Sequence, residues 1–326
     1  MTTGTAAVRV PEPAAMPSPT GANYAFIVGH YKSGSTWLAN LLALHPDIRC
    51  LGETNVFRYA ATQDIATATR NLFTSSYWSG GGLARLPRHR LAVAAAAVQG
   101  LWRQAPPRTA RPSTLLDLSL LDQRALRREL LASRSGEDYC RRFFDFVGAR
   151  LKPRAYLVEK TPNHVLVTPF IRSVFPEARL VAVYRDGRDV VVSDRFFSAR
   201  RGRAWNFAAS VEYWRRLIEA QRAYASKYGI FTCAYESLLE DGAGTVAGLL
   251  RFLGLPADEH VSAMLRYSSI SFMTGRRPGD EDRGSFYRRG VRGDWRNHFT
   301  DEDKRRFKEI AGDLLIELGY ERDGDW

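Results

Sequence analysis

The sequence predicts an α/β protein with a mostly parallel sheet flanked by helices. Short apolar segments alternate with amphipathic helical segments, as the crossover connections of a parallel sheet require. The chain of 326 residues is 45% hydrophobic, which is enough to bury a substantial core. A Gly- and Ser-rich turn follows the first apolar segment and opens a helix, which is typical of a phosphate loop. The predicted strands are 24–29, 155–158, 179–184 and 230–235.

The helical segments are amphipathic, and several of them end at proline or glycine. The first, 35–45, is stopped by Pro46. The last begins after Thr300, a favourable N-cap, and ends near Gly319. A polar, Gly- and Arg-rich loop is expected over 274–297. The other predicted helices are 139–151, 168–175, 188–198, 207–228, 246–253 and 258–267.

The chain divides into a tail and one domain. Residues 1–22 are rich in Pro, Ala and Thr and predict a flexible tail, and residues 23–326 predict a single domain. Within it, about 58–136 predicts a helical insertion or lid, because an Ala-rich run is broken by glycines at 80–82 and prolines at 106–107.

Charge and composition narrow the partners. The net charge of +12 favours an anionic partner: a nucleotide, a nucleic acid, a membrane surface or an acidic substrate. The three cysteines are far apart and the six histidines form no HExxH pattern, so we expect no metal site. No segment resembles a signal peptide or a membrane span, and we expect a cytoplasmic protein.

Residues 29–36, GHYKSGST, form the candidate phosphate loop. Backbone N–H groups at a helix N-terminus bind anions, and glycine lets the ligand approach closely. A nucleoside triphosphatase has its lysine directly after the second glycine, where this chain has Ser35; here Lys32 precedes Gly34. The loop therefore predicts a phosphate ligand but departs from the triphosphatase pattern.

Two further segments predict anion binding. Arg185 follows the strand 179–184, at the edge of the sheet where ligands bind in such folds, and Ser193 lies two turns into the next helix. A guanidinium and a hydroxyl suit a phosphate dianion. Near the C-terminus, residues 286–300 (FYRRGVRGDWRNHFT) are basic and Gly-rich.

Together these motifs resemble those of sulfotransferases that use 3′-phosphoadenosine 5′-phosphosulfate (PAPS). YKSGSTWL is similar to the family's 5′-phosphosulfate loop, PKSGTTWL, although Tyr31 replaces proline. YRDGRDVVVS is similar to its 3′-phosphate site, and 286–300 is similar to its RKGxxGDWxNxFT loop. The resemblance spans the beginning, middle and end of the chain and implies the P-loop-like sulfotransferase fold.

The resemblance also implies a role for each matching residue. Lys32 contacts the bridging oxygen between phosphate and sulfate. Trp37 and Tyr235 contact the adenine, and Phe272 stacks on its other face. The 5′-phosphate is held by Ser33, Gly34, Ser35 and Thr36. The 3′-phosphate is held by Arg185, Ser193, Arg288, Arg289 and Gly290.

Two residues compete for the role of catalytic base. Glu53, in HPDIRCLGETNVF, resembles the catalytic glutamate of tyrosylprotein sulfotransferases. His164, in VEKTPNH, resembles the catalytic histidine of cytosolic sulfotransferases, but the family's histidine position is taken by Pro162. We favour Glu53 and keep His164 as the alternative. Lys160 matches the family's second active-site lysine and is expected to help hold the transferred sulfuryl group.

The predicted function is transfer of the sulfuryl group of PAPS to a hydroxyl of a small, partly apolar acceptor by in-line displacement, without metal. Aromatic residues near Glu53 and in the insertion suggest the apolar pocket: Phe57, Tyr59, Phe73, Tyr77, Trp78 and Trp102. The alternatives are a metal-dependent P-loop kinase or NTPase and, less favoured, a nucleic-acid-binding protein, for which the sequence has no known motif. No pattern in the sequence specifies an oligomeric state.

Overall fold

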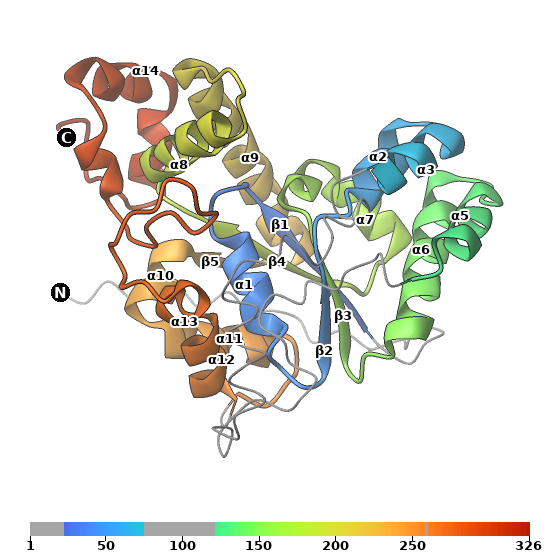
Figure 1. Cartoon of the computed structure of the whole chain (residues 1–326). Helices are drawn as coiled ribbons and strands as arrows, with labels where there is room; N and C mark the ends of the chain where they lie inside the picture. Colours follow the sequence, from blue (N-terminus) through green and yellow to red (C-terminus); the bar gives the residue numbers. More distant parts are fainter. Residues whose placement is uncertain (1–22, 75–120, 258–259) are drawn as a thin grey trace.

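The computed structural model describes residues 23–74, 121–257 and 260–326 (Figure 1). The predicted tail and the middle of the predicted insertion, with Tyr77, Trp78 and Trp102, lie outside these ranges. The three aromatic residues of the proposed acceptor pocket that are described, Phe57, Tyr59 and Phe73, belong to or pack against the hydrophobic core. They therefore help to form the core beneath the sheet and do not support a pocket wall at these positions.

Five parallel strands form the sheet, which confirms the predicted fold class. Their spatial order is β2 (Ile48–Leu51), β3 (Tyr156–Lys160), β1 (Asn23–Gly29), β4 (Arg179–Tyr184) and β5 (Phe231–Ala234). Strand β2 was not predicted. Its four residues, IRCL, are too short for a periodic signal, and pairing with β3 at the sheet edge defines it.

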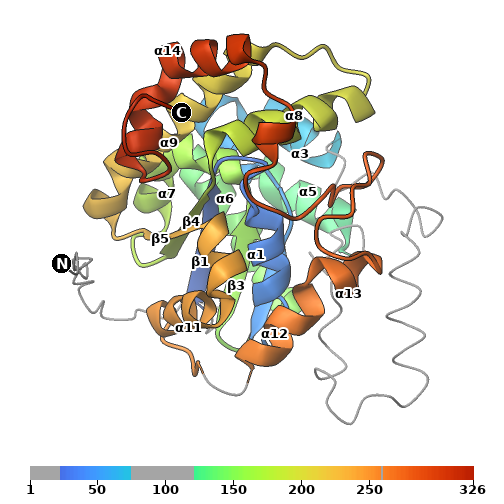
Figure 2. The ribbon, with the colours of Figure 1, turned by 90° about the vertical axis from the view of Figure 1, so that its left-hand side faces the viewer.

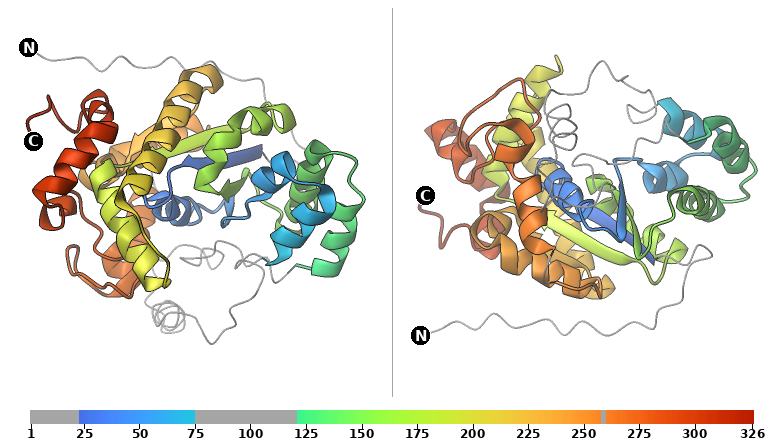
Figure 3. Two further views of the ribbon diagram at one scale, coloured as in Figure 1. Left: turned by 90° about the horizontal axis from the view of Figure 1, so that it is seen from above. Right: turned by 60° about the horizontal axis from the view of Figure 1, so that its bottom comes forward.

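Alternate residues of β1 point to opposite faces of the sheet and supply two cores. Phe26 and Val28 join the first core, whereas Ala25 and Ile27 join the second. Figures 2 and 3 show helices on both sides of the sheet. The first core is covered by α2 (Val56–Thr62), α3 (Ile65–Thr74), α5 (Gln123–Leu131), α6 (Gly136–Leu151), α7 (Thr168–Val174) and α9 (Phe207–Tyr228). The second is covered by α1 (Ser35–Leu42), α11 (Gly242–Phe252) and α12 (Val261–Ser268).

A third core joins α8 (Gly187–Arg200), α9 and α14 (Asp301–Glu317), which lie together in Figure 1. Trp214 of α9 lies so close to Gly187 that a Cβ there would be 2.6 Å from the indole ring. Thr300 caps α14 and forms a capping box with Asp303, as its sequence predicted for the N-cap. These contacts fix the start of α8, next to the strand end that carries Arg185.

Short helices at the strand and loop ends were missed by the sequence prediction. Helix α10 (Tyr235–Glu240) begins where the predicted fourth strand was expected to end. Helix α13 (Ile270–Thr274) lies just before the Gly- and Arg-rich segment 275–297, the basic loop. The described residues also include two 3₁₀ helices, η3 (Pro162–Val167) and η4 (Asp294–Asn297). None of the helices in the described ranges has the length and hydropathy needed to cross a membrane.

Candidate active site

Each strand of the sheet delivers a predicted site residue at its carboxyl end. Lys32 follows β1, Glu53 follows β2, and Lys160 ends β3; Arg185 follows β4, and Tyr235 follows β5. Because all five strands are parallel, these residues lie at one edge of the sheet. The topology therefore gathers residues that are more than 200 positions apart in sequence, from Lys32 to Tyr235.

A cavity of about 230 Å³ lies at this edge. All the predicted cofactor-binding residues except Ser33 and Phe272 line it: Lys32, Gly34, Ser35, Thr36, Trp37, Arg185, Ser193, Tyr235, Arg288, Arg289 and Gly290. Ser33 is fully buried next to it. Phe272 is not among the lining residues; its ring packs edge-on against Tyr267, with centroids 4.9 Å apart, so the structure does not support its predicted adenine contact.

The phosphate loop places the start of α1 at this cavity. Gly34, at φ 92°, is the N-cap of α1 and has no side chain to occupy the first-turn N–H groups. A Cβ at Gly34 would lie 2.5 Å from the ring of Tyr235, so only glycine fits between the loop and this ring. Trp37 lies edge-on to Tyr235, and its Nε1 donates to Ser268 at 3.1 Å.

Lys32 lies between two aromatic rings. Its Nζ is 4.5 Å from the ring centre of Phe197, on α8, and 4.7 Å from that of Phe286, in the basic loop. Burial lowers the pKa of Lys32 to about 8, and the charges of Arg200 and Arg185 act in the same direction. The side chain is thus a cation with unusually little solvation at the mouth of the cavity.

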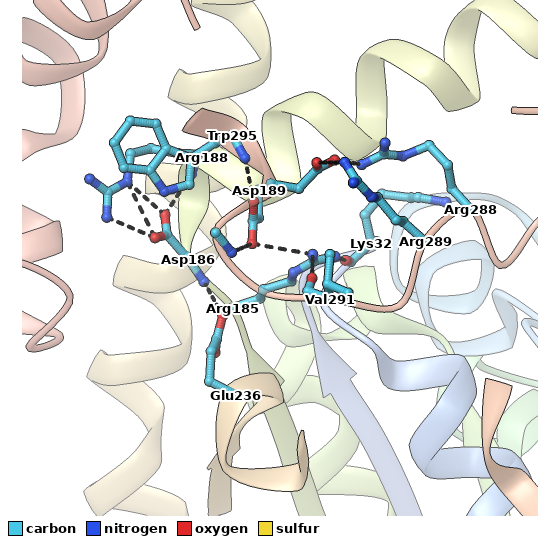
Figure 4. A network of polar contacts seen from close by, with 12 residues as sticks. Lys32, Arg185, Asp186, Arg188, Asp189, Glu236, Arg288, Arg289, Val291 and Trp295 are labelled. Atoms are coloured by element: carbon cyan, nitrogen blue, oxygen red, sulfur yellow. Dashed lines mark hydrogen bonds and ion pairs between the residues drawn. The ribbon is translucent and has the colours of Figure 1, made fainter. Parts of the chain in front are cut away.

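Asp189 joins the second and third anion-binding segments (Figure 4). Arg185 donates to the carbonyl of Val291 at 2.8 Å and pairs with Asp189 at 3.3 Å. The same carboxylate accepts from the backbone N–H groups of Gly293, at 2.7 Å, and Trp295, at 2.9 Å. One buried carboxylate therefore holds both the arginine at the strand end and the basic loop.

A second carboxylate, Asp294, organises the arginines of that loop. It forms ion pairs with Arg288 and Arg289 and accepts from Asn297 at 3.0 Å. Burial alone would raise the pKa of Asp294, but the hydrogen bonds from Asn297 and Arg288 and the charges of both arginines lower it to about 2. We did not predict a role for Asp189 or Asp294. The available signal was the presence of acidic residues inside two otherwise basic motifs: Asp186 and Asp189 in the first, and Asp294 in the second.

Arg188 packs against Trp295, which follows the arginines of the same loop (Figure 4). Its guanidinium carbon lies 4.0 Å from the ring centre of Trp295 and 4.4 Å from that of Trp326. It is buried and pairs with Asp186 at 2.8 Å and with Glu321. Arg188 thus ties the C-terminal residues and the loop to the start of α8. Its positive charge is balanced by Asp186 and Glu321.

Glu53 and Lys160 form an ion pair beside the phosphate loop. Lys160 Nζ lies 2.5 Å from Glu53 Oε1 and donates to Thr36 Oγ1 at 3.1 Å. The Lys160 side chain is 1% exposed, whereas that of Glu53 is 36% exposed. Glu53 is therefore an accessible carboxylate held next to Thr36, a cavity-lining residue.

His164 occupies a different environment from Glu53. Its side chain is fully buried and its Nδ1 lies 3.2 Å from Glu159 Oε2. Glu159 also accepts from the backbone N–H and the hydroxyl of Thr54 and from the hydroxyl of Thr161. Burial alone would raise the pKa of Glu159, but His164 and these hydrogen bonds lower it. This arrangement does not support His164 as the base; instead it fixes Thr54, the residue after Glu53.

Fold and cavity together define an α/β nucleotide-binding protein of the phosphate-loop type. A family model described as "Sulfotransferase family" matches residues 25–259, and the chain belongs to this family. Human sulfotransferase 2B1 is 27% identical over 179 residues, which are 47% of this chain and 49% of that protein. The 3-beta-hydroxysteroid sulfotransferase of Cavia porcellus is 27% identical over 191 residues, or 52% and 64% of the two chains. The match thus spans about half to two thirds of these relatives.

Solved structures show the same fold. The sulfotransferase domain of the Synechococcus PCC 7002 olefin synthase superposes with a TM-score of 0.57 and 17% identity, covering 93% of this chain and 98% of that domain. Mouse sulfotransferase SULT7A1 complexed with PAP gives a TM-score of 0.53 and 15% identity, covering 93% of this chain and 88% of that chain.

Within the described ranges, no cluster of three His, Cys, Asp or Glu side chains is arranged to hold a metal ion.

Proposed function

We propose that this protein transfers the sulfuryl group of PAPS to a hydroxyl group. The proposal depends on one observation: two separate groups of residues suited to binding anions line one cavity. They are Lys32 with the start of α1, and Arg185 with Ser193 and the 288–290 loop. A nucleotide with phosphates on both its 5′ and 3′ positions matches two such sites. The neighbour solved with PAP, the desulfated product of PAPS, supports the same ligand.

The residues of the cavity suit in-line displacement at sulfur. The acceptor oxygen forms the new S–O bond while the bond from sulfur to the bridging phosphate oxygen breaks. Lys32 is placed to stabilise the negative charge that develops on this leaving oxygen. The positive end of the α1 dipole and the amides near Gly34 stabilise the departing 5′-phosphate in the same way.

We assign the catalytic base to Glu53. Its carboxylate is accessible and is oriented by Lys160, which also contacts Thr36 of the phosphate loop. In this role Glu53 takes the proton of the acceptor hydroxyl as the new bond forms. Lys160 lies between the base and the phosphate loop, and in that place it serves as the second cation for the transferred group.

We propose a hydroxylated small molecule with a partly apolar body as acceptor. The guinea-pig relative is named as a hydroxysteroid sulfotransferase, which supports a hydroxyl on an apolar body. The cavity offers apolar contacts of its own from Ile270, Phe286 and Val291.

A transfer assay with sulfur-labelled PAPS tests the function. The full chain is incubated with PAPS, excess EDTA and a panel of phenols, sterols, sugars and peptides. We expect label on at least one phenol or sterol and no loss of activity in EDTA. Label transfer that requires magnesium, or phosphoryl transfer from ATP, would instead support a P-loop kinase. If only free sugars or acidic peptides are sulfated, the function stands and the apolar acceptor is wrong.

A further inference from the structure

A second, smaller hollow adjoins the nucleotide cavity. One face of α8 supplies Ser193, Phe196, Phe197 and Arg200, which follow the i, i+3, i+4, i+7 spacing of a helix face. The basic loop supplies the opposite wall: Arg283, Ser285, Phe286 and Arg288. Lys32 lines both spaces, so the hollow opens beside the residue that we place on the leaving oxygen.

Cationic side chains surround the hollow and lie over two phenylalanine rings that line it. Arg283 and Arg288 lie 5.2 and 4.6 Å from the ring centre of Phe196. Lys32, Arg200 and Arg201 lie 4.5, 5.4 and 4.9 Å from that of Phe197. No Asp or Glu is among the described residues that line the hollow.

The nearby acids neutralise only part of this charge. Glu281 pairs with Arg283 at 3.1 Å and with Arg288 at 2.7 Å, and Asp294 also pairs with Arg288. Arg200 donates only to the carbonyl of Gly284, at 3.4 Å, among the described contacts. Burial and the charge of Arg201 lower the pKa of Arg200, and Asp282 opposes them. An anion placed here would relieve repulsion among the remaining cations.

The proposed nucleotide accounts for only part of this charge, because Lys32 and Arg288 line both spaces. Arg200 and Arg283 line the hollow but not the nucleotide cavity. The hollow has a volume of about 10 Å³, enough for one water-sized group and too small for a second nucleotide. It therefore has room for one oxygen atom of an acidic group carried by the other substrate, and the planar forks of the two arginines on its wall suit a carboxylate.

We propose that Arg200 and Arg283 form an acceptor subsite for a carboxylate, next to the point of sulfuryl transfer. The inference rests on the proposed function and adds to it: the preferred acceptor carries an acidic group as well as a hydroxyl on an apolar body. The subsite selects acidic acceptors over neutral ones and leaves binding of the nucleotide unchanged.

Calorimetry on the PAP-saturated full chain tests this with two matched pairs of probes. Each pair compares an acid with its methyl ester: 4-hydroxybenzoate, and 3-(4-hydroxyphenyl)propionate. We expect at least one acid to bind about tenfold or more tightly than its ester, the usual size of a charged hydrogen bond. The double variant Arg200→Met, Arg283→Met removes this preference. Arg203→Met, an exposed arginine of the same segment that does not line the hollow, keeps it.

Three results would overturn the subsite. The acids could bind the wild type no more tightly than their esters, or not at all. The preference could survive in the double variant. The double variant could weaken PAP but not AMP, which lacks the 3′-phosphate; Arg200 and Arg283 would then belong to the nucleotide site. A wild type that fails to bind PAP contradicts the proposed function itself, so the two failures are distinguishable.

Discussion

Lys32 has a lowered pKa, and we propose that it stabilises the leaving oxygen; together these predict a pH dependence of the reaction. A lysine whose pKa is about 8 in the free enzyme is charged below that value and neutral above it. We expect kcat/KM for PAPS to fall as the pH rises through about 8, measured with a neutral alcohol acceptor. Lys32→Arg keeps the charge and should remove this alkaline limb. If kcat/KM for PAPS falls in the same way in Lys32→Arg, another titrating group causes the fall.

Glu53 is predicted to act in turnover and not in nucleotide binding. Glu53→Gln keeps the shape of the side chain but removes its basicity, so kcat should fall by roughly 10²–10⁴. The affinity for PAP, measured by calorimetry, should stay within a few-fold.

His164→Gln is the matched comparison for Glu53. Because His164 is buried against Glu159, its substitution should lower the melting temperature, while the folded fraction keeps most of its kcat. If, with both proteins folded, His164→Gln loses more kcat than Glu53→Gln, then His164 is the catalytic base and Glu53 is not.

At the scale of the element, the phosphate loop depends on a glycine under an aromatic ring. Gly34→Ala forces a Cβ to within 2.5 Å of Tyr235, and we expect PAP affinity to fall by at least about tenfold as loop and ring separate. Gly254→Ala is the control: it also has a positive φ, 68°, but nothing lies within 4 Å of the added Cβ. It should cost about 1 kcal/mol of stability and leave PAP binding unchanged. Equal PAP affinity in both variants would falsify the close fit.

The docking of the basic loop onto α8 is a second property at this scale. Asp189→Asn keeps one acceptor oxygen but loses the charge that faces Arg185, as well as the second oxygen, which serves a backbone N–H group. We expect about tenfold weaker binding of PAP and a smaller change for AMP. If the variant loses stability but the ratio of its affinities for PAP and AMP is unchanged, Asp189 has only a structural role.

The sequence predicted the long elements well and the short ones poorly. Strand β4 and helix α9 have the predicted bounds, because each has a strong pattern over its whole length. Strand β2 and helices α10 and α13 are four to six residues long, and tertiary pairing or packing defines them.

The site shows the same division between local and long-range information. Most of the predicted anion-binding residues line one cavity, and each could be proposed from a contiguous motif. The carboxylates Asp189 and Asp294 act across loops that meet only in the folded chain, so spacing alone gave them no role. The Glu53–Lys160 pair likewise joins residues 107 positions apart.

For the whole molecule, the parallel sheet explains why both groups of predicted anion-binding residues line one cavity. The loop after β1 brings α1 and its amides, and the residue after β4 brings Arg185 to the same edge. The C-terminal segment then closes over this edge through Asp189 and Arg188. We therefore propose that this fold recognises a nucleotide that carries both a 5′- and a 3′-phosphate.

Calorimetric titration of the wild type and Arg185→Ala with PAP and with AMP tests that claim most directly. We predict that the wild type binds PAP about tenfold to a hundredfold more tightly than AMP, because the 3′-phosphate gains charged hydrogen bonds. Arg185→Ala should lose most of this preference while its affinity for AMP changes little. Equal affinity of the wild type for PAP and AMP would contradict the assignment of the 3′-phosphate site, and with it the proposed use of PAPS.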